Sequence, residues 1–256
     1  MFTLENKTAF VTGGSSGIGY GVAGAFRDLG AVVVIADIAD GRQCAHDIGA
    51  EYVKVDVSDE KSVEQALRAA AKLVGAKFDA VVLNAGVGDV GPTFQNTDEA
   101  LLKKVTRINQ WGIFYGLKHA PACMNDGGSI ISTASMAAFI NLPGAGVYSA
   151  GKRAVISMTE TAALELGGRG IRVNAVCPGY TATALGSGDE GQLLCEAFTA
   201  LGRVAEVDDM VGVYAFLASD ASRYITGQSL KVDGGWSCGP TERLLEIVTG
   251  SAAAPG

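Results

Sequence analysis

The sequence has few histidines, and its cysteines are not paired in sequence. Only two of its 256 residues are histidines, His46 and His119, and its five cysteines are scattered, with no C-x-x-C pair. A zinc site needs several such ligands at close spacing, so we expect no metal site built on histidine. An odd number of unpaired cysteines indicates free thiols, most of which we expect to be buried as small apolar groups.

Long apolar runs and clusters of positive charge are also missing. No stretch approaches the roughly 18 apolar residues that a membrane-spanning helix needs, and residues 1–10 lack the features of a secretory signal peptide. The formal net charge is -7 and the isoelectric point is near 4.9, which makes nucleic acid and anionic membranes poor partners. We therefore expect a soluble, cytoplasmic protein whose partner is a small molecule.

Hydrophobic residues are plentiful, at 48% against 18% charged, and they suit one extended core. Short runs rich in β-branched residues alternate with segments of helical periodicity. The expected strands are 8–11, 32–35, 52–55, 80–83, 129–132, 171–176 and 230–232, and the expected helices are 17–29, 59–74, 97–120, 147–167 and 206–218. This alternation is typical of an α/β protein whose parallel sheet is covered by helices on both faces. We expect one domain over 1–256, with a C-terminal extension, 237–256, that holds an amphipathic segment at 241–248.

A glycine-rich turn, T-G-G-S-S-G-I-G at 12–19, follows an expected strand and opens an expected helix. Glycines let the backbone turn sharply and approach a ligand, and the N–H groups at a helix start attract a pyrophosphate. Asp37 ends the second expected strand, where a carboxylate can bond both hydroxyls of an adenosine ribose. The same carboxylate would repel a 2′-phosphate, and no Arg or Lys stands at Ser15, Ser16 or Ile38 to bind one. The sequence therefore predicts NAD, rather than NADP, as the cofactor.

Tyr148 and Lys152 are four residues apart in an expected helix, so their side chains share a face. A cation beside a phenol in a partly desolvated site favours the phenolate and lowers the phenol's pKa towards working pH. The pair therefore predicts a general base.

Two other motif matches lack their necessary partners. Residues 13–17 fit the G-x-S-x-G nucleophile elbow, but a hydrolase needs a later histidine and the chain has none beyond His119. Residues 146–152 fit most of a phosphate loop, but Arg153 stands where a Ser or Thr should hold magnesium, and no strand leads into it. We interpret neither match as functional.

These residues resemble the short-chain dehydrogenase/reductase family over about 5–236. The likeness rests on T-G-x-x-x-G-I-G at 12–19, N-A-G at 84–86, Y-x-x-x-K at 148–152, P-G at 178–179 and V-D-G-G at 232–235, in the family's order and spacing. The resemblance implies a Rossmann-type, doubly wound parallel sheet of about seven strands, and a homotetramer with helices near 97–120 and 147–167 between subunits.

The resemblance also implies the site residues and their roles. Ser135, thirteen residues before Tyr148, would hold the substrate oxygen, Tyr148 would be the base, and Lys152 would lower the phenol's pKa and bond the nicotinamide ribose. Asn109 would support a water-mediated proton path to the lysine. The expected NAD site comprises Gly13, Ser15, Ser16, Gly17, Ile18, Gly19, Asp37, Ile38, Asp56, Val57, Asn84, Ala85, Gly86, Tyr148, Lys152, Pro178, Gly179, Thr181 and Thr183. Within it, the resemblance puts Asp56 and Val57 at the adenine and the two threonines at the nicotinamide carboxamide.

The chain departs from the family pattern at Gly151, where a Ser or Thr is usual. A glycine inside a helix costs roughly 1 kcal/mol against alanine, and either close packing of another helix or a wider cofactor pocket would explain it. The extension beyond Gly235 is a second departure, and it is a candidate to line a pocket in its own or a neighbouring subunit.

The expected substrate pocket is almost entirely apolar. Its candidate residues are Val87, Met136, Phe139, Ile140, Leu142, Tyr180, Leu185 and Phe198, with 185–198 resembling the family's mobile lid. No Lys or Arg is among them, so we predict an uncharged, bulky, cyclic or aromatic secondary alcohol or its ketone. Half of these residues could equally be ordinary core. A dihydrodiol or 3-hydroxyacyl substrate, or a silent NAD-binding sensor, are the alternatives.

Overall fold

The computed structural model describes residues 2–88, 91–184 and 189–251, with no side-chain detail at 189–190. Within them, seven strands form one parallel sheet in the order β3-β2-β1-β4-β5-β6-β7. The strands are β1 (Thr8–Thr12), β2 (Val32–Asp37), β3 (Glu51–Lys54), β4 (Phe78–Leu83), β5 (Met124–Thr133), β6 (Arg172–Pro178) and β7 (Ser229–Val232). The order reverses between β1 and β4, which confirms the doubly wound sheet expected from the sequence.

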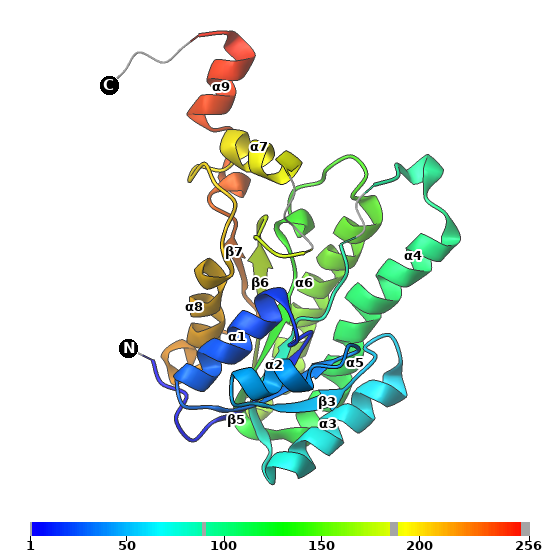
Figure 1. The fold of residues 1–256 in the computed structure, drawn as a ribbon, viewed down its shortest axis with the longest axis vertical. Helices are drawn as coiled ribbons and strands as arrows, with labels where there is room; N and C mark the ends of the chain where they lie inside the picture. The colour runs from blue at the N-terminus through cyan, green and yellow to red at the C-terminus, as the bar shows by residue number, and fades with distance from the viewer. Residues whose placement is uncertain (1, 89–90, 185–188, 252–256) are drawn as a thin grey trace.

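Helices cover both faces of this sheet (Figure 1). They are α1 (Gly17–Asp28), α2 (Arg42–Asp47), α3 (Glu60–Val74), α4 (Glu99–Thr106), α5 (Gly112–His119), α6 (Gly146–Leu166), α7 (Asp189–Phe198), α8 (Val207–Ala218) and α9 (Glu242–Thr249). Helices α3, α5 and α6 bury their apolar faces with one side of the strands, whereas α1, α2 and α8 do so with the other. Successive residues of a strand, such as Phe10 and Val11, belong to opposite cores, which is why these strands read as continuous apolar runs.

The structure corrects the sequence-based prediction in several places. The helix expected over 97–120 is α4 and α5 joined by a π-helical turn at Arg107–Trp111, and the short α2 was not expected. Of the five cysteines, all free, only Cys177 and Cys195 are buried, so the expectation that most would be buried is wrong. Across the described ranges, no helix combines the length and apolar character needed to cross a membrane.

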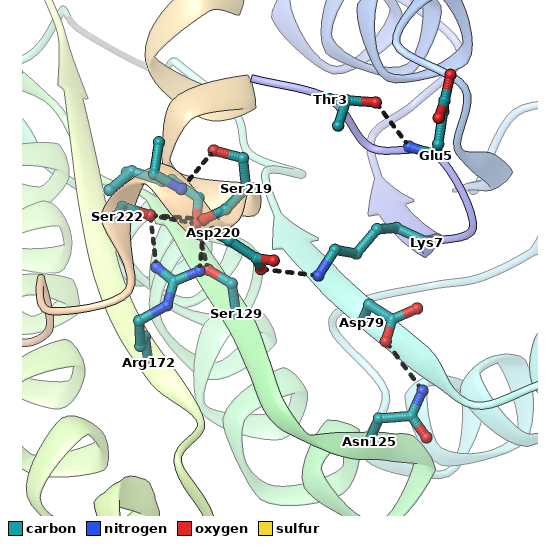
Figure 2. Close-up of polar contacts among 12 residues, drawn as sticks. Thr3, Glu5, Lys7, Asp79, Asn125, Ser129, Arg172, Ser219, Asp220 and Ser222 are labelled. Carbon is teal, nitrogen blue, oxygen red and sulfur yellow. Dashed lines mark hydrogen bonds and ion pairs between the residues drawn. The ribbon is translucent and has the colours of Figure 1, made fainter. Parts of the chain in front are cut away.

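Polar contacts close the amino ends of the strands (Figure 2). The buried Arg172 guanidinium donates to Ser222 Oγ at 2.7 Å and to the Ser219 carbonyl oxygen at 3.2 Å. Lys7, just before β1, forms an ion pair with Asp220 at 2.8 Å. These contacts fasten the end of α8 to β1 and β6, and they leave the carboxyl ends of the strands as the edge where parallel sheets place their ligand sites.

Candidate active site

The glycine-rich turn after β1 presents a helix start that no side chain caps. Helix α1 begins at Gly17 with no side-chain cap, and the first bond into it runs from Tyr20 N to Ser16 O at 3.1 Å. The N–H groups of the first turn therefore have no acceptor among the described residues, and they carry the positive end of the helix dipole. The Ser15 hydroxyl is also buried without a partner in the described part of the chain. This donor set fits a bound pyrophosphate.

The glycines of this turn serve two different purposes. A Cβ on Gly19 would lie 2.2 Å from Gly13 O, and one on Gly13, at φ +65°, would lie 2.9 Å from Ala85 Cα. Those two glycines allow β1, α1 and the segment after β4 to pack together. Gly17 differs, because a Cβ there would lie 3.2 Å from Thr183 Cγ2. Thr183 thus stands over the turn, where a ligand on the helix start would lie.

Asn84 ties three elements together at the sheet edge. Its Nδ2 donates to Thr12 O at 3.2 Å, and its Oδ1 accepts from Thr133 Oγ1 at 3.1 Å. Thr133 Oγ1 lies 2.8 Å from the Tyr214 hydroxyl. These bonds use the polar atoms of the Asn84 side chain. Within the N-A-G motif, a ligand would therefore meet Ala85 and Gly86, which are half-buried.

Asp37 stands at the end of β2 beside the glycine turn. Its Oδ2 accepts from Ser15 N and its Oδ1 from Ala39 N, each at 3.1 Å. The nearby cation Arg42 is held by Asp40, with Nε 2.9 Å from Oδ1. Ile38 is 62% exposed at the rim. At the end of β3, Asp56 Oδ1 accepts from Ser58 N (2.9 Å) and Oγ (2.7 Å), and Val57 is half-buried against α5.

Ser135, Tyr148 and Lys152 converge from two elements. Helix α6 places Tyr148 and Lys152 one turn apart, and Lys152 Nζ lies 5.7 Å from the centroid of the Tyr148 ring. Lys152 is only 4% exposed, and its Nζ donates to Thr133 O at 2.8 Å. Ser135, just beyond β5, hydrogen-bonds Tyr148 through its side chain and accepts from Ala137 N at 3.1 Å.

The electrostatics of this pair differ from the sequence-based expectation. Burial raises the pKa of Tyr148, although the hydrogen bond with Ser135 acts in the opposite direction, and nearby Tyr180 raises it further. Burial also lowers the pKa of Lys152 to about 8. The expectation of a lowered phenol pKa is therefore wrong for the protein alone, because desolvation disfavours the charged form of both groups. At pH 7 the pair is a neutral phenol beside a protonated lysine.

Asn109 is fully buried in the π-helical turn and fixes the chain after N-A-G. Its Oδ1 accepts from Val87 N at 2.8 Å, and its Nδ2 donates to Val87 O at 2.7 Å. A Cβ on Gly86 would lie 3.0 Å from Asn109 Oδ1 and 3.5 Å from Lys152 Nζ, so Gly86 leaves room for both side chains. π-helical turns often mark functional sites, and the sequence pattern did not reveal this one.

Close packing does not explain Gly151. The residue is buried in α6, yet an added Cβ would meet only Asn109 Cβ, at 3.9 Å, which is ordinary contact.

Four of the eight expected pocket residues gather in a small apolar cluster. Met136, Ile140, Tyr180 and Phe198 pack with Cys195 and Trp236, whereas Val87 and Leu142 are half-buried elsewhere. Leu185 lies outside the described residues, and the end of the expected lid is helix α7. Trp236 was missed from the sequence, although its place directly after V-D-G-G was a signal.

We expected no Lys or Arg beside the pocket residues, and this expectation is wrong for Phe139. Lys231 Nζ lies 4.5 Å, and Arg153 Cζ 5.8 Å, from the centroid of its ring. Phe139 packs against the core on the α6 side of the sheet and is not a member of the Trp236 cluster. None of residues Glu242–Thr249 is buried, and α9 extends beyond α7 (Figure 1). The start of the extension nevertheless lines a hollow of about 500 Å³ within this chain, where Thr241, Glu242 and Arg243 face Glu196 and Thr199.

Comparison with known proteins agrees with this architecture. A family model described as enoyl-(acyl carrier protein) reductase matches residues 13–237. A borneol dehydrogenase, named as mitochondrial, from Lavandula x intermedia is 41% identical over 241 residues, covering 91% of this chain and 92% of that protein.

Solved structures agree as well. A short-chain type dehydrogenase/reductase from Mycobacterium marinum superposes with a TM-score of 0.87 at 35% identity, covering 93% of this chain and 98% of that one. A blue fluorescent protein from a metagenomic library, solved in complex with NADPH, gives a TM-score of 0.86 at 34% identity, covering 91% and 99%. The chain belongs to the short-chain dehydrogenase/reductase family of oxidoreductases.

Proposed function

We propose that the protein is an NAD(H)-dependent dehydrogenase that interconverts a hydrophobic cyclic or aromatic secondary alcohol and its ketone. The observation that carries the proposal is the meeting of Ser135, Tyr148 and Lys152 at the carboxyl edge of the sheet, next to an uncapped helix start. A proton-transfer group and a phosphate-binding turn side by side are what alcohol oxidation by a dinucleotide requires.

The residues present fit the dinucleotide. The first turn of α1 and the Ser15 hydroxyl would hold the pyrophosphate, Asp37 the adenosine ribose hydroxyls, and Lys152 the nicotinamide ribose. Thr181 and Thr183 would face the carboxamide. Bound NAD would supply the hydride acceptor.

In this proposal, Ser135, Tyr148 and Lys152 carry out the proton transfer. Ser135 donates a hydrogen bond to the substrate oxygen and holds it against Tyr148. Tyr148, as phenolate, takes the hydroxyl proton while a hydride leaves the carbinol carbon. The protonated Lys152 stabilises that phenolate, which offsets the burial that raises the pKa of the phenol. Asn109 orders the Val87 backbone beside the lysine for a water-mediated proton path. Ketone reduction follows the same route in reverse.

Asp37 favours NAD over NADP. A 2′-phosphate would stand against its carboxylate, and Arg42, which could otherwise neutralise the phosphate, is engaged by Asp40. The NADPH complex of the metagenomic relative is a property of that protein, so the cofactor choice here rests on these side chains.

The apolar cluster around Met136, Tyr180 and Trp236 supports a hydrophobic substrate. Borneol, the substrate named for the Lavandula relative, is a bulky cyclic secondary alcohol of this class. A dihydrodiol or a 3-hydroxyacyl thioester on the same scaffold is the alternative, and a silent NAD-binding sensor the less favoured one.

We also propose that the enzyme is a cytoplasmic homotetramer. Trp111, Phe114 and Leu164 are 42%, 49% and 86% exposed. A hollow of about 330 Å³ lies among Gln110, Trp111, Phe114, Tyr115 and Met158, on the helices expected between subunits. An exposed apolar surface of this kind is typical of a subunit contact.

A spectrophotometric assay of NADH formation tests the proposal. Purified protein is mixed with NAD and one substrate at a time. The substrates are alicyclic and aryl secondary alcohols, a dihydrodiol and a 3-hydroxyacyl thioester. We expect the alicyclic or aryl alcohol to give the highest kcat/KM. A clear win for the thioester would contradict the substrate class, and no turnover with any of them, despite NAD binding, would favour the sensor.

A further inference from the structure

The V-D-G-G motif builds a rigid turn directly ahead of Trp236. Asp233 Oδ1 accepts from Gly235 N at 3.0 Å, and Oδ2 accepts from Ser237 N at 3.1 Å. Gly234 and Gly235 both have positive φ, +62° and +85°, which only glycine adopts at low cost in succession. The carboxylate and the two glycines therefore fix the direction in which the indole leaves the turn.

The indole of Trp236 is the middle ring of a three-ring stack. Its centroid lies 5.5 Å from that of Tyr180 at an interplanar angle of 23°, and 5.2 Å from that of Phe198 at 12°. Trp236 is 6% exposed. Near-parallel rings at these separations attract one another and resist independent movement.

One end of the stack reaches the reacting groups. Tyr180 follows Pro178-Gly179 at the end of β6 and packs, with Trp236, in one apolar cluster with Met136, the residue directly after Ser135. A Cβ on Gly179 would stand 2.9 Å from Asp233 Cα, so the bare glycine lets the two chain segments touch. The position of Tyr180 is thereby tied to the turn that carries Trp236.

The other end reaches helix α7 and the C-terminal segment. Phe198 is the last residue of α7. Thr241 Oγ1 donates to Ala197 O, and Arg243 forms an ion pair with Glu196 at 3.4 Å. Trp236 thus joins α7, the C-terminal segment and Tyr180 in one unit.

We propose that Trp236 is a positioning residue that sets substrate shape selectivity. By stacking between Tyr180 and Phe198 of α7, it fixes the orientation of the Tyr180 ring, whose outer face makes a flat wall near Ser135 and Tyr148 that a ring contacts more fully than an open chain does. This inference rests on the proposed function, because it assigns a preference among secondary alcohols to the same site.

The test compares Trp236→Leu with Trp236→Phe, which keeps a flat ring. For each protein, kcat/KM is measured with NAD for cyclohexanol and for an open-chain secondary alcohol of equal carbon number. We expect Trp236→Leu to lower the ring-to-chain ratio by about tenfold or more and Trp236→Phe to keep it within about threefold. An unchanged ratio in an active Trp236→Leu enzyme would overturn the inference and leave the proposed function intact.

A second measurement decides the matter if the leucine variant fails to fold or the wild type oxidises neither alcohol. The chain has two tryptophans, so Trp111→Phe leaves Trp236 as the sole reporter of intrinsic fluorescence. We expect cyclohexanol to change its emission saturably and the open-chain alcohol to do so less at equal concentration. If the two alcohols changed the Trp236 emission equally, or not at all, the proposed role of Trp236 would be refuted. Failure of turnover alone would refute only the proposed function.

Discussion

Replacing Lys152 with methionine should stabilise the fold while it stops catalysis. The side chain is 4% exposed, and burial lowers its pKa from 10.5 to about 8. At about 1.36 kcal/mol for each pH unit of pKa difference, holding the ammonium in this site costs the folded state about 3 kcal/mol at pH 7. Methionine has a similar length and no charge. It would leave Thr133 O without the donor now 2.8 Å away, a loss of about 1 kcal/mol. The net gain should be about 2 kcal/mol.

The gain should depend on pH in a defined direction. Since the folded pKa lies below that of an unfolded lysine, the unfolded chain binds more protons between pH 8 and about 10.5. The wild-type free energy of unfolding should therefore rise with pH across this window relative to the variant. The advantage of Lys152→Met is full below pH 8 and should vanish as pH approaches 10.5.

Urea unfolding at pH 7 and pH 10 measures both effects. Lys61→Met, at an exposed lysine of α3, is the matched control and should change the free energy of unfolding by less than about 0.5 kcal/mol. If Lys152→Met is less stable than the wild type at pH 7, the ammonium is better solvated or paired than its burial indicates, and the reasoning is wrong.

Two further outcomes follow from the glycines and the cofactor site. Gly151→Ala should raise the free energy of unfolding by about 0.5–1 kcal/mol with activity retained. Gly116→Ala should lower it by about 1–3 kcal/mol, because the added Cβ would lie 2.4 Å from Leu83 Cδ2. Thermal melts that rank the two variants in the opposite order would contradict this account of the packing. Wild-type kcat/KM should favour NAD over NADP by at least about a hundredfold, and Asp37→Asn should narrow that ratio. Equal use of both cofactors by the wild type would refute the role given to Asp37.

Much of the fold was predictable because its signals are local. The buried strands show as β-branched runs, and the glycine turn marks the first strand-to-helix junction. The π-helical turn at Arg107–Trp111 was not predictable, since the same residues suit an α-helix and only contacts such as Asn109 with Val87 select the wider turn. Helix α2 is six residues long, too short for periodicity to reveal.

The sequence predicted which residues form the candidate site better than it predicted their pKa values. The spacing of Tyr148 and Lys152, and of Ser135 before them, identified side chains that the structure brings together. The direction of the phenol's pKa was wrong because the depth of burial is a property of the packed structure. Trp236 was missed because one aromatic after a turn cannot be told from core until its partners, distant in sequence, are in place.

The central claim is that Tyr148 performs the proton step of hydride transfer, and single-turnover reduction of NAD by an alicyclic secondary alcohol tests it most directly. Tyr148→Phe removes one oxygen and keeps the ring, so NAD should bind as in the wild type. The account predicts that NADH forms in the wild type and that its rate falls by at least about a hundredfold in the variant. NADH formation by Tyr148→Phe within about tenfold of the wild-type rate would contradict the claim.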